Sequence, residues 1–307
     1  MADQVTMDHW GDTWINQIKA NKERFGTLAE FSVGKLFNAH RHQPAIIAGA
    51  GPSLKNNVEG LKHRNGIPLV SCLHNFHFME DNEVDVDYYC TLDSGPITIK
   101  EVAEGGKRTA KEYWELTRER TLIAYIGSHP ELLEKWQGKI YFFNAPLPSK
   151  DLMEKIDEIE VFRAFMSSGG NVLGSCLYFA KAVLGCNPIA YVGADFSFGY
   201  DEKFHSWDSD YDKSLGRYVK AVDIYGLPVK TWQSYANFKS WFDYIAETVP
   251  GIYINCTEGG CLGAYQGGNI RSIRQLRLME FLQMYNLNHH IADPMNNPSS
   301  EMKKVLF

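Results

Sequence analysis

Short apolar runs alternate with longer segments of helical periodicity from residue 44 onward. The runs occupy residues 45–49, 68–72, 87–93, 121–125, 139–144, 188–193 and 251–255. Continuous apolar runs are typical of strands buried on both faces, and helical segments between such strands are typical of a parallel sheet. The pattern therefore predicts an α/β fold with a Rossmann-like, largely parallel sheet and helices on both faces. In such sheets the loops after the strands gather at one edge, where ligands bind.

Three segments depart from this alternation and predict a division of the chain. Apolar residues recur every three or four positions near the N-terminus, which predicts a helical segment over 1–43. A single α/β domain is expected over 44–285, and its acidic, aromatic stretch 196–230 predicts a lid-like insertion. The remaining residues, 286–307, are expected to form a loosely held tail or a contact in a homo-oligomer.

Composition excludes several classes of protein. The chain has 307 residues with 31 Lys and Arg against 37 Asp and Glu, a net charge of −6 that argues against tight nonspecific binding of nucleic acid. The apolar runs fall far short of the ~20 residues that span a bilayer, and residues 1–14 have neither the basic nor the apolar region of a secretion signal. We expect a cytoplasmic protein without a membrane segment. Six cysteines without a C-x-x-C pair indicate reduced, mostly buried thiols.

The first apolar run leads into a glycine-rich turn, Gly49-Ala50-Gly51-Pro52-Ser53-Leu54. Glycines let the backbone approach a ligand, and Ser53 can cap the following helix, whose free N–H groups attract an anion. The turn predicts a cradle for a phosphate or nucleotide, although it is neither a Walker loop nor a complete G-x-G-x-x-G motif. The alternative is a plain strand-to-helix turn.

A second turn of this kind precedes an apolar helix expected over 172–185. It contains Ser168 and Gly169 within Met166–Asn171, and the helix leads directly into the run at 188–193. Backbone N–H groups converge at such a helix start. Two such turns at one sheet edge predict a nucleotide held between them, whereas the alternative is that the glycines only permit close helix packing.

Two aspartates end predicted strands at the edge where ligands bind. Asp195 follows the run at 188–193, and Asp93 ends the run at 87–93. An acidic side chain there can contact a ribose hydroxyl, a metal or a reacting hydroxyl. If both face one cleft they can hold a metal or divide acid and base chemistry. The alternative for Asp195 is helix capping.

Further candidates follow other strands. Asn75 stands between His74 and His77 and can contact a base or sugar. The two histidines are acid-base candidates, although a histidine between aromatic residues is more often simply packed. Glu258 and Gly259 lie in a glycine-rich loop that can close over a ligand. Three arginines at helical spacing predict a basic stripe or a solvated helix face: Arg271, Arg274 and Arg277.

Together these stretches resemble a known group. They are residues 45–54, the Asn75 segment, Ser168-Gly169 with the following helix, and Tyr191-Val192-Gly193-Ala194-Asp195-Phe196. They are similar to bacterial sialyltransferases that use CMP-sialic acid, and more similar to the MptE-like and motility-accessory-factor superfamily. That superfamily includes flagellin nonulosonic acid glycosyltransferases and archaeal 6-hydroxymethylpterin diphosphokinases, and Glu258-Gly259-Gly260 also suits it. The resemblance implies a nucleotide contacted by Gly49, Gly51, Ser53, Asn75, Ser168 and Gly169.

The resemblance also shows departures from the sialyltransferase pattern. Their general base is a histidine before the last strand, but Gln233 occupies that place here and cannot accept the proton. An expected asparagine near the end of the third strand is replaced by Asp93. This leaves His205, within the lid-like insertion, as another candidate base beside Asp195 and Asp93.

Three functions follow as hypotheses. The first is a glycosyltransferase that uses a nucleotide sugar, such as a CMP-linked nonulosonic acid, and an acceptor hydroxyl on a glycan, protein or small alcohol. The second is an ATP-dependent diphosphokinase, which needs Mg²⁺. The third is a nucleotide-binding protein without turnover.

Overall fold

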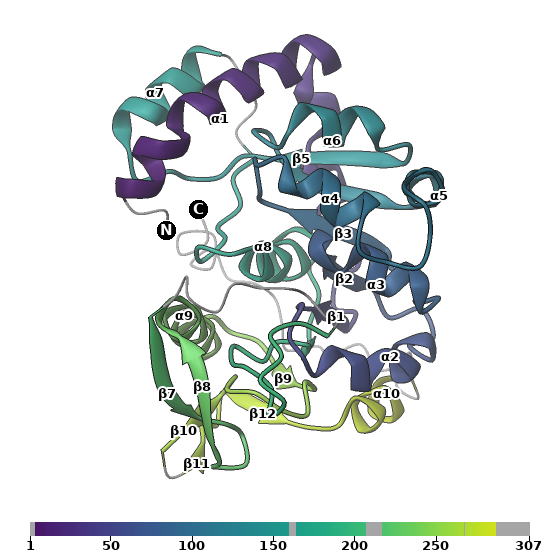
Figure 1. Cartoon of the computed structure of the whole chain (residues 1–307), viewed down its shortest axis with the longest axis vertical. Helices are drawn as coiled ribbons and strands as arrows, with labels where there is room; N and C mark the ends of the chain where they lie inside the picture. The colour runs from purple at the N-terminus through teal and green to yellow at the C-terminus, as the bar shows by residue number, and fades with distance from the viewer. Residues whose placement is uncertain (1–3, 160–163, 207–216, 267, 287–307) are drawn as a thin grey trace. The chain divides into compact units, whose positions relative to one another are not determined.

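The computed structural model describes residues 4–159, 164–206, 217–266 and 268–286 (Figure 1). Most of the predicted tail, with His289 and His290, lies outside the described residues, as does the middle of the predicted lid-like insertion. The predicted division at residues 43 and 285 stays a prediction. Among the described residues no helix combines the length and the apolar character needed to cross a membrane.

An eight-stranded parallel sheet organises the fold, which confirms the predicted α/β class. Its order is β12-β9-β6-β1-β2-β3-β4-β5. Seven strands fall within the predicted apolar runs: β1 (Ala45–Ala48), β2 (Leu69–Cys72), β3 (Tyr88–Thr91), β4 (Thr121–Tyr125), β5 (Lys139–Phe143), β6 (Ile189–Val192) and β9 (Tyr253–Asn255). All residues of β1, β2 and β6 are buried, as expected for strands covered on both faces.

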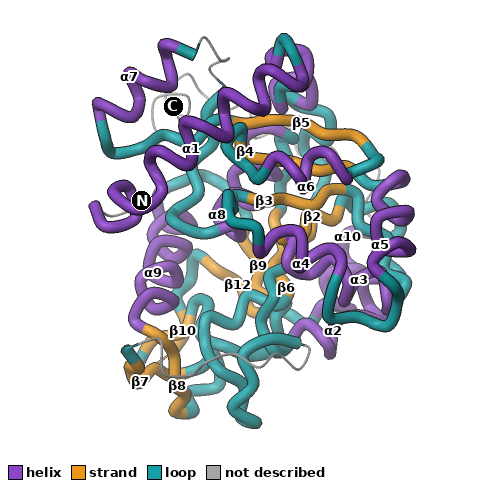
Figure 2. The backbone as a smooth tube through the Cα atoms, turned by 45° about the horizontal axis from the view of Figure 1, so that its top comes forward, coloured by secondary structure: helices purple, strands orange, loops and turns teal. Residues whose placement is uncertain are grey.

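Helices follow most of the strands. The described helices are α1 (Gln4–Phe25), α2 (Leu54–Lys62), α3 (Phe76–Asp81), α4 (Ile97–Ala103), α5 (Ala110–Leu116), α6 (Pro130–Lys135), α7 (Lys150–Glu158), α8 (Val172–Tyr178), α9 (Gln233–Thr248) and α10 (Leu278–Asn286). A π-helical turn over Phe179–Val183 extends α8, so the apolar helix predicted over 172–185 is confirmed. The predicted N-terminal helix is α1, which buries Ile15 and Ile18 and lies beside α7 in both views (Figures 1 and 2).

The chain forms two compact units. One comprises the described residues of 1–39, 70–81 and 86–184, and the other those of 40–69, 82–85 and 185–307. The first unit contains β3, β4 and β5 with α1 and α3 through α8. The second contains β1, β6, β9 and β12 (Ile273–Gln275), together with α2, α9 and α10.

An antiparallel hairpin in the second unit was not predicted. It joins β7 (Tyr218–Val222) to β8 (Pro228–Trp232) at the end of the stretch 196–230 expected to form a lid, and α9 packs against both strands (Figure 1). A smaller hairpin pairs β10 (Ala264–Tyr265) with β11 (Gly268–Asn269). The helical reading of the arginine stripe was wrong, because Arg274 lies in β12 and pairs with β9.

Candidate functional site

Three loops meet at the carboxyl ends of neighbouring strands in the second unit. In the sheet, β6 lies between β9 and β1 and is parallel to both. The loops that follow these strands are residues 49–53, 193–197 and 256–261. The Ala194 amide donates to Thr257 Oγ1 at 3.1 Å, and the Cys261 amide donates to the Asp195 carbonyl at 2.6 Å. This edge is where the strand pattern predicted a ligand site.

Glycines permit the close approach of these loops. A Cβ on Gly49 would lie 2.5 Å from the Gly193 carbonyl oxygen, and one on Gly51 would lie 2.0 Å from Asp195 Oδ2. Gly193 has a φ of +59°, a backbone region that side chains other than glycine rarely adopt. The first glycine-rich turn therefore packs its backbone directly against the segment that carries Asp195.

Ser53 and Asp195 form the central contact of this cluster. Ser53 Oγ donates to Asp195 Oδ2 at 2.8 Å, and the Ser53 amide points to the same oxygen at 3.4 Å. The prediction that Ser53 caps α2 with its side chain was wrong: Ser53 occupies the N-cap position with helical backbone angles, and its hydroxyl forms no cap bond. Its hydroxyl is turned to Asp195, whose carboxylate in turn accepts a backbone N–H at the start of α2.

Asp195 is buried, with only 4% of its surface exposed. Desolvation raises its pKa from 3.8 to about 7, against the lowering effect of the Ser53 hydroxyl, the backbone N–H groups and the Lys55 charge. A carboxyl with a pKa near neutrality can accept or release a proton at physiological pH. The predicted catalytic candidate therefore has the acid-base property that such a role requires.

Glu258 and Gly259 lie in the third loop. Glu258 Oε1 accepts hydrogen bonds from Asn57 Nδ2 at 3.3 Å and from the Leu278 amide at 3.1 Å, so its carboxylate joins α2 to the start of α10. A Cβ on Gly259 would lie 3.8 Å from Ser53 Cβ and 3.9 Å from Asp195 Oδ1, which places this glycine beside the central pair. Ligand contacts from both residues stay predictions.

His205 lies against the first glycine-rich turn. Its Nδ1 is 3.2 Å from the Ala50 carbonyl oxygen, and the neighbouring Ser206 hydroxyl donates to the Gly51 carbonyl at 2.6 Å. The His205 side chain is buried, with 8% of its surface exposed. The start of the predicted lid-like insertion thus packs on this turn, and a role for His205 as a base stays a prediction.

A cavity of about 300 Å³ opens beside the Ser53–Asp195 pair. Lys55, in the first turn of α2, contributes a positive charge to its lining and forms an ion pair with Asp201 at 3.4 Å. The lining is Pro52, Ser53, Lys55, Asn56, Asp195, Ser197, Phe198, Gly199, Tyr200, Asp201, Asp223, Val229, Glu258, Gly259 and Gly260. The cavity therefore combines a helix N-terminus and an ammonium group with several carboxylates.

The hairpin positions one wall of this cavity. Its turn donates the Ile224 amide to the Gly260 carbonyl at 2.9 Å and the Tyr225 hydroxyl to the Glu258 carbonyl at 3.2 Å. Asp223 Oδ1 accepts from the Tyr225 and Leu227 amides, and Oδ2 accepts from the Tyr200 hydroxyl. The turn is thereby bonded both to the glycine-rich third loop and to the segment after Asp195.

Three other predicted residues, Asn75, Ser168 and Gly169, belong to the first unit. Asn75 is fully buried, and its Nδ2 donates to Ser71 Oγ at 3.1 Å. Ser168 Oγ accepts from the Gly170 amide at 3.2 Å, and Gly169 has a φ of +58°, which forms the turn before α8. Asn171 caps α8 through Oδ1, which accepts from the Gly174 amide. Ligand contacts from these residues stay predictions.

Asp93 is exposed after β3 in the first unit. Desolvation by nearby protein atoms and the negative charge of Glu101 raise its pKa. Glu101 also accepts a hydrogen bond from His74 Nδ1 at 2.8 Å. Glu101 is therefore the acidic neighbour of Asp93, and His74 lies beside Glu101.

A metal site requires several side chains whose ligating atoms lie close together. Among the described residues, no group of three or more His, Cys, Asp or Glu side chains is placed to hold a metal ion. Mg²⁺ usually takes only one or two protein carboxylates together with substrate phosphates and water. Asp195, Asp201, Asp223 and Glu258 line the cavity and are the carboxylates that could hold such an ion.

Several cavity residues were missed from the sequence. Lys55, Tyr200, Asp201 and Asp223 line the cavity although none was a candidate. Lys55 offered a signal, because it stands two positions after Ser53 at the start of a helix facing the ligand edge. The other three lie in the acidic and aromatic stretch, whose contacts depend on the unpredicted hairpin.

Comparisons with known proteins place these features in context. A search of curated proteins found no match. Among solved structures, the Maf glycosyltransferase from Magnetospirillum magneticum AMB-1 is similar, with a TM-score of 0.57 and 14% sequence identity. The alignment covers 89% of this chain but 41% of that protein, so the chain spans less than half of its length, and the likeness establishes the fold alone.

A family model also matches the chain. The model describes 6-hydroxymethylpterin diphosphokinase MptE-like proteins and matches residues 16–201, which include both predicted glycine turns and Asp195. Because the match spans more than half of the sequence, this chain belongs to the MptE-like family.

Proposed function

We propose that this protein is a transferase that moves a glycosyl group from a nucleotide sugar to an acceptor hydroxyl. The observation that carries the proposal is the Ser53–Asp195 pair, which places a buried carboxyl with a pKa of about 7 beside a cavity at the start of α2. A CMP-linked nonulosonic acid is the donor that the sequence resemblance favours.

In this proposal the residues of the cavity have different chemical roles. The ionised Asp195 accepts the proton of the acceptor hydroxyl while that oxygen forms a bond to the anomeric carbon. The bond from the anomeric carbon to the phosphate oxygen breaks, and its electron pair leaves with the nucleotide. Lys55 and the N-terminus of α2 stabilise the charge on the leaving phosphate.

Independent observations support a nucleotide-dependent transferase. The fold is similar to that of a Maf glycosyltransferase, and the family model takes its description from a diphosphokinase. Both kinds of enzyme use a phosphate-containing donor and an acceptor hydroxyl. The proposal needs only that the donor phosphate reaches the cavity beside Ser53.

The acidic lining favours a second candidate, a diphosphokinase. Asp195, Asp201, Asp223 and Glu258 line the same cavity as Lys55, and this surplus of carboxylates would repel an unaccompanied polyphosphate. A bound Mg²⁺ would supply the positive charge that pyrophosphoryl transfer needs at the donor phosphates. Asp195 would then help to hold the metal rather than accept the acceptor proton.

Nucleotide binding with and without metal tests both candidates. The full chain is titrated with CMP, UDP, GDP and ATP by isothermal calorimetry, once with Mg²⁺ and once with EDTA, and Ser53→Ala and Asp195→Asn are measured in parallel. Glycosyl transfer predicts binding of CMP that survives EDTA, followed by release of CMP from a CMP-linked sugar at a rate that Asp195→Asn reduces at least about 100-fold.

The opposite results separate the alternatives. ATP binding that disappears with EDTA, with no binding of CMP, would overturn glycosyl transfer in favour of the diphosphokinase. Binding of none of the four nucleotides under either condition would overturn both.

A further inference from the structure

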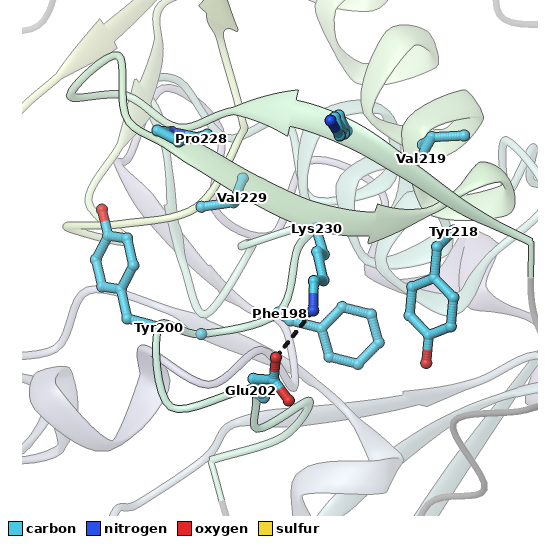
Figure 3. A pocket seen from close by; sticks show the side chains of 10 residues that line it. Phe198, Tyr200, Glu202, Tyr218, Val219, Pro228, Val229 and Lys230 are labelled. Carbon is cyan, nitrogen blue, oxygen red and sulfur yellow. Dashed lines mark hydrogen bonds and ion pairs between the residues drawn. The ribbon is translucent and has the colours of Figure 1, made fainter.

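A second and larger cavity adjoins the candidate site. Its volume is about 830 Å³, within the usual range of small-molecule sites. It lies between the β7–β8 hairpin and residues 198–202, and Figure 3 shows the Phe198 and Tyr218 rings below the hairpin with Lys230 reaching toward Glu202. All of its lining residues belong to the second unit.

The two cavities share a wall. Phe198, Gly199, Tyr200 and Val229 line both the larger cavity and the smaller one that contains Asp195. Phe198 is held in this wall by its amide, which donates to the Lys230 carbonyl at 2.9 Å, and by its ring, which packs edge-on against Trp232 at 5.2 Å. A molecule bound in the larger cavity is therefore next to the proposed reaction centre.

The lining combines apolar surfaces with opposite charges. The rings of Phe198 and Tyr218 lie 5.6 Å apart, and Val219, Pro228 and Val229 add aliphatic surface. Glu202 and Lys230 form an ion pair at 2.9 Å, and both side chains are more than half exposed. Lys220 contributes a second ammonium group.

This combination of apolar and charged side chains favours some classes of ligand over others. A purely aromatic or aliphatic ligand would strip water from Glu202 and Lys230 without replacing their hydrogen bonds, which is costly. A phosphate presents only acceptor oxygens, so it would pair with the ammonium groups but leave the Glu202 carboxylate without a donor. Sugar hydroxyls both donate and accept hydrogen bonds, so a carbohydrate can pair with the carboxylate and the ammonium groups while the C–H face of its ring packs on Tyr218 or Phe198.

We propose that this cavity is the acceptor site and that the acceptor is a carbohydrate, packed on the Tyr218 ring and hydrogen-bonded to Glu202 and Lys230. The proposal rests on the proposed glycosyltransferase function and adds the substrate class to it. Gly199 and Tyr200 line both cavities, so the acceptor hydroxyl would approach Asp195 along this shared side.

Saturation-transfer NMR with a panel of methyl glycosides tests the proposal. The panel contains methyl glycosides of glucose, galactose, mannose and N-acetylglucosamine, with phenol and a short serine peptide as competing classes. We expect saturation transfer to at least one glycoside. Tyr218→Ala should weaken that binding roughly tenfold, and Tyr218→Phe, which keeps the ring, should retain it within about twofold.

Two controls make the result specific. Tyr244→Ala removes an exposed tyrosine of α9 that lines neither cavity, and it should leave glycoside binding unchanged. Thermal unfolding of Tyr218→Ala shows whether the hairpin variant folds. If it does not, Glu202→Gln provides the test, since it keeps the size of the side chain and should also weaken glycoside binding severalfold.

Nucleotide titration of the same proteins separates this proposal from the proposed function. Tyr218→Ala should bind the nucleotide with unchanged affinity. If wild-type protein binds a nucleotide but no glycoside, or binds phenol or the peptide instead, the carbohydrate site is wrong and the transferase proposal stands. If no nucleotide binds while glycosides bind at Tyr218, the proposed function is wrong and the carbohydrate site stands.

Discussion

The Ser53 hydroxyl donates to the Asp195 carboxylate at 2.8 Å, across the gap between the loops that follow β1 and β6. The hydroxyl at the start of α2 is thereby used to hold a buried acid rather than to cap its own helix. Because desolvation raises the pKa of that acid to about 7, one contact links the stability of the fold to the chemistry of the proposed site.

Asp195→Asn should change how stability depends on pH. The pKa of Asp195 rises from 3.8 to about 7 on folding, so between these values the folded protein holds a proton that the unfolded chain has released. Wild-type stability should therefore fall as pH increases from about 4 to 7, by up to about 4 kcal/mol from this residue. The unfolding free energy of the asparagine variant should not show this decrease. Urea unfolding of both proteins at pH 4.5, 6 and 8 would measure the difference.

Asp201→Asn is the matched control for this measurement, because the Asp201 side chain is 45% exposed and pairs with Lys55 at the surface. Its unfolding free energy should follow the wild-type pH profile above pH 5. Parallel profiles for wild type and Asp195→Asn would show that Asp195 titrates as an ordinary exposed carboxyl.

Gly51→Ala should be strongly destabilising. The new methyl carbon would lie 2.0 Å from Asp195 Oδ2 and 2.7 Å from the Gly193 carbonyl oxygen, so either the Ser53–Asp195 bond or the loop backbone must shift. We expect a loss of about 2–3 kcal/mol in unfolding free energy. Gly34→Ala is the control, since its methyl carbon would meet only Ser32 Oγ at 3.4 Å. Equal stability of the two variants in chemical denaturation would contradict the packing described for the first turn.

Lys55→Met should weaken nucleotide binding about tenfold, because it removes a positive charge from the cavity beside α2. Raising the salt concentration should weaken wild-type binding more than binding to the variant. Lys62→Met serves as the control, since Lys62 lies on the same helix, pairs with Glu59 and does not line the cavity. A similar affinity for both variants by calorimetry would place the phosphate away from Lys55.

The sheet could be predicted because its signal is local. Runs such as Ala45–Ala48 and Ile189–Val192 are apolar at every position, and only a strand buried on both faces needs that pattern. The edge strand β12 has no such run, since only Ile273 of its three residues is buried. Its Arg274 instead matched a helical period together with Arg271 and Arg277.

The candidate site could be predicted only in part. The positions of the predicted strand ends placed four residues at one edge of the sheet: Gly51, Ser53, Asp195 and Glu258. The hydrogen bonds among them could not be predicted, because they depend on side-chain rotamers and on how segments distant in the sequence pack together. The hairpin had a recognisable signal in two alternating stretches, Tyr218–Val222 and Pro228–Trp232, joined by a turn with Asp223 and Gly226. Surrounding acidic and aromatic residues masked that signal.

Asp223→Ala should loosen the hairpin turn and with it the wall shared by the two cavities. Its carboxylate accepts the Tyr225 and Leu227 amides at 2.9 and 2.8 Å, and it also accepts the Tyr200 hydroxyl. Losing these bonds should lower the unfolding free energy by about 2 kcal/mol and speed hydrogen exchange of both amides at least tenfold. Tyr200→Phe removes only the hydroxyl bond, so it should leave the exchange of these amides within about threefold of wild type. If both variants accelerate exchange equally, the bond from the Tyr200 hydroxyl stabilises the turn, and the bonds from the Tyr225 and Leu227 amides to Asp223 add little. The segment that carries Tyr200 would then hold the hairpin in place.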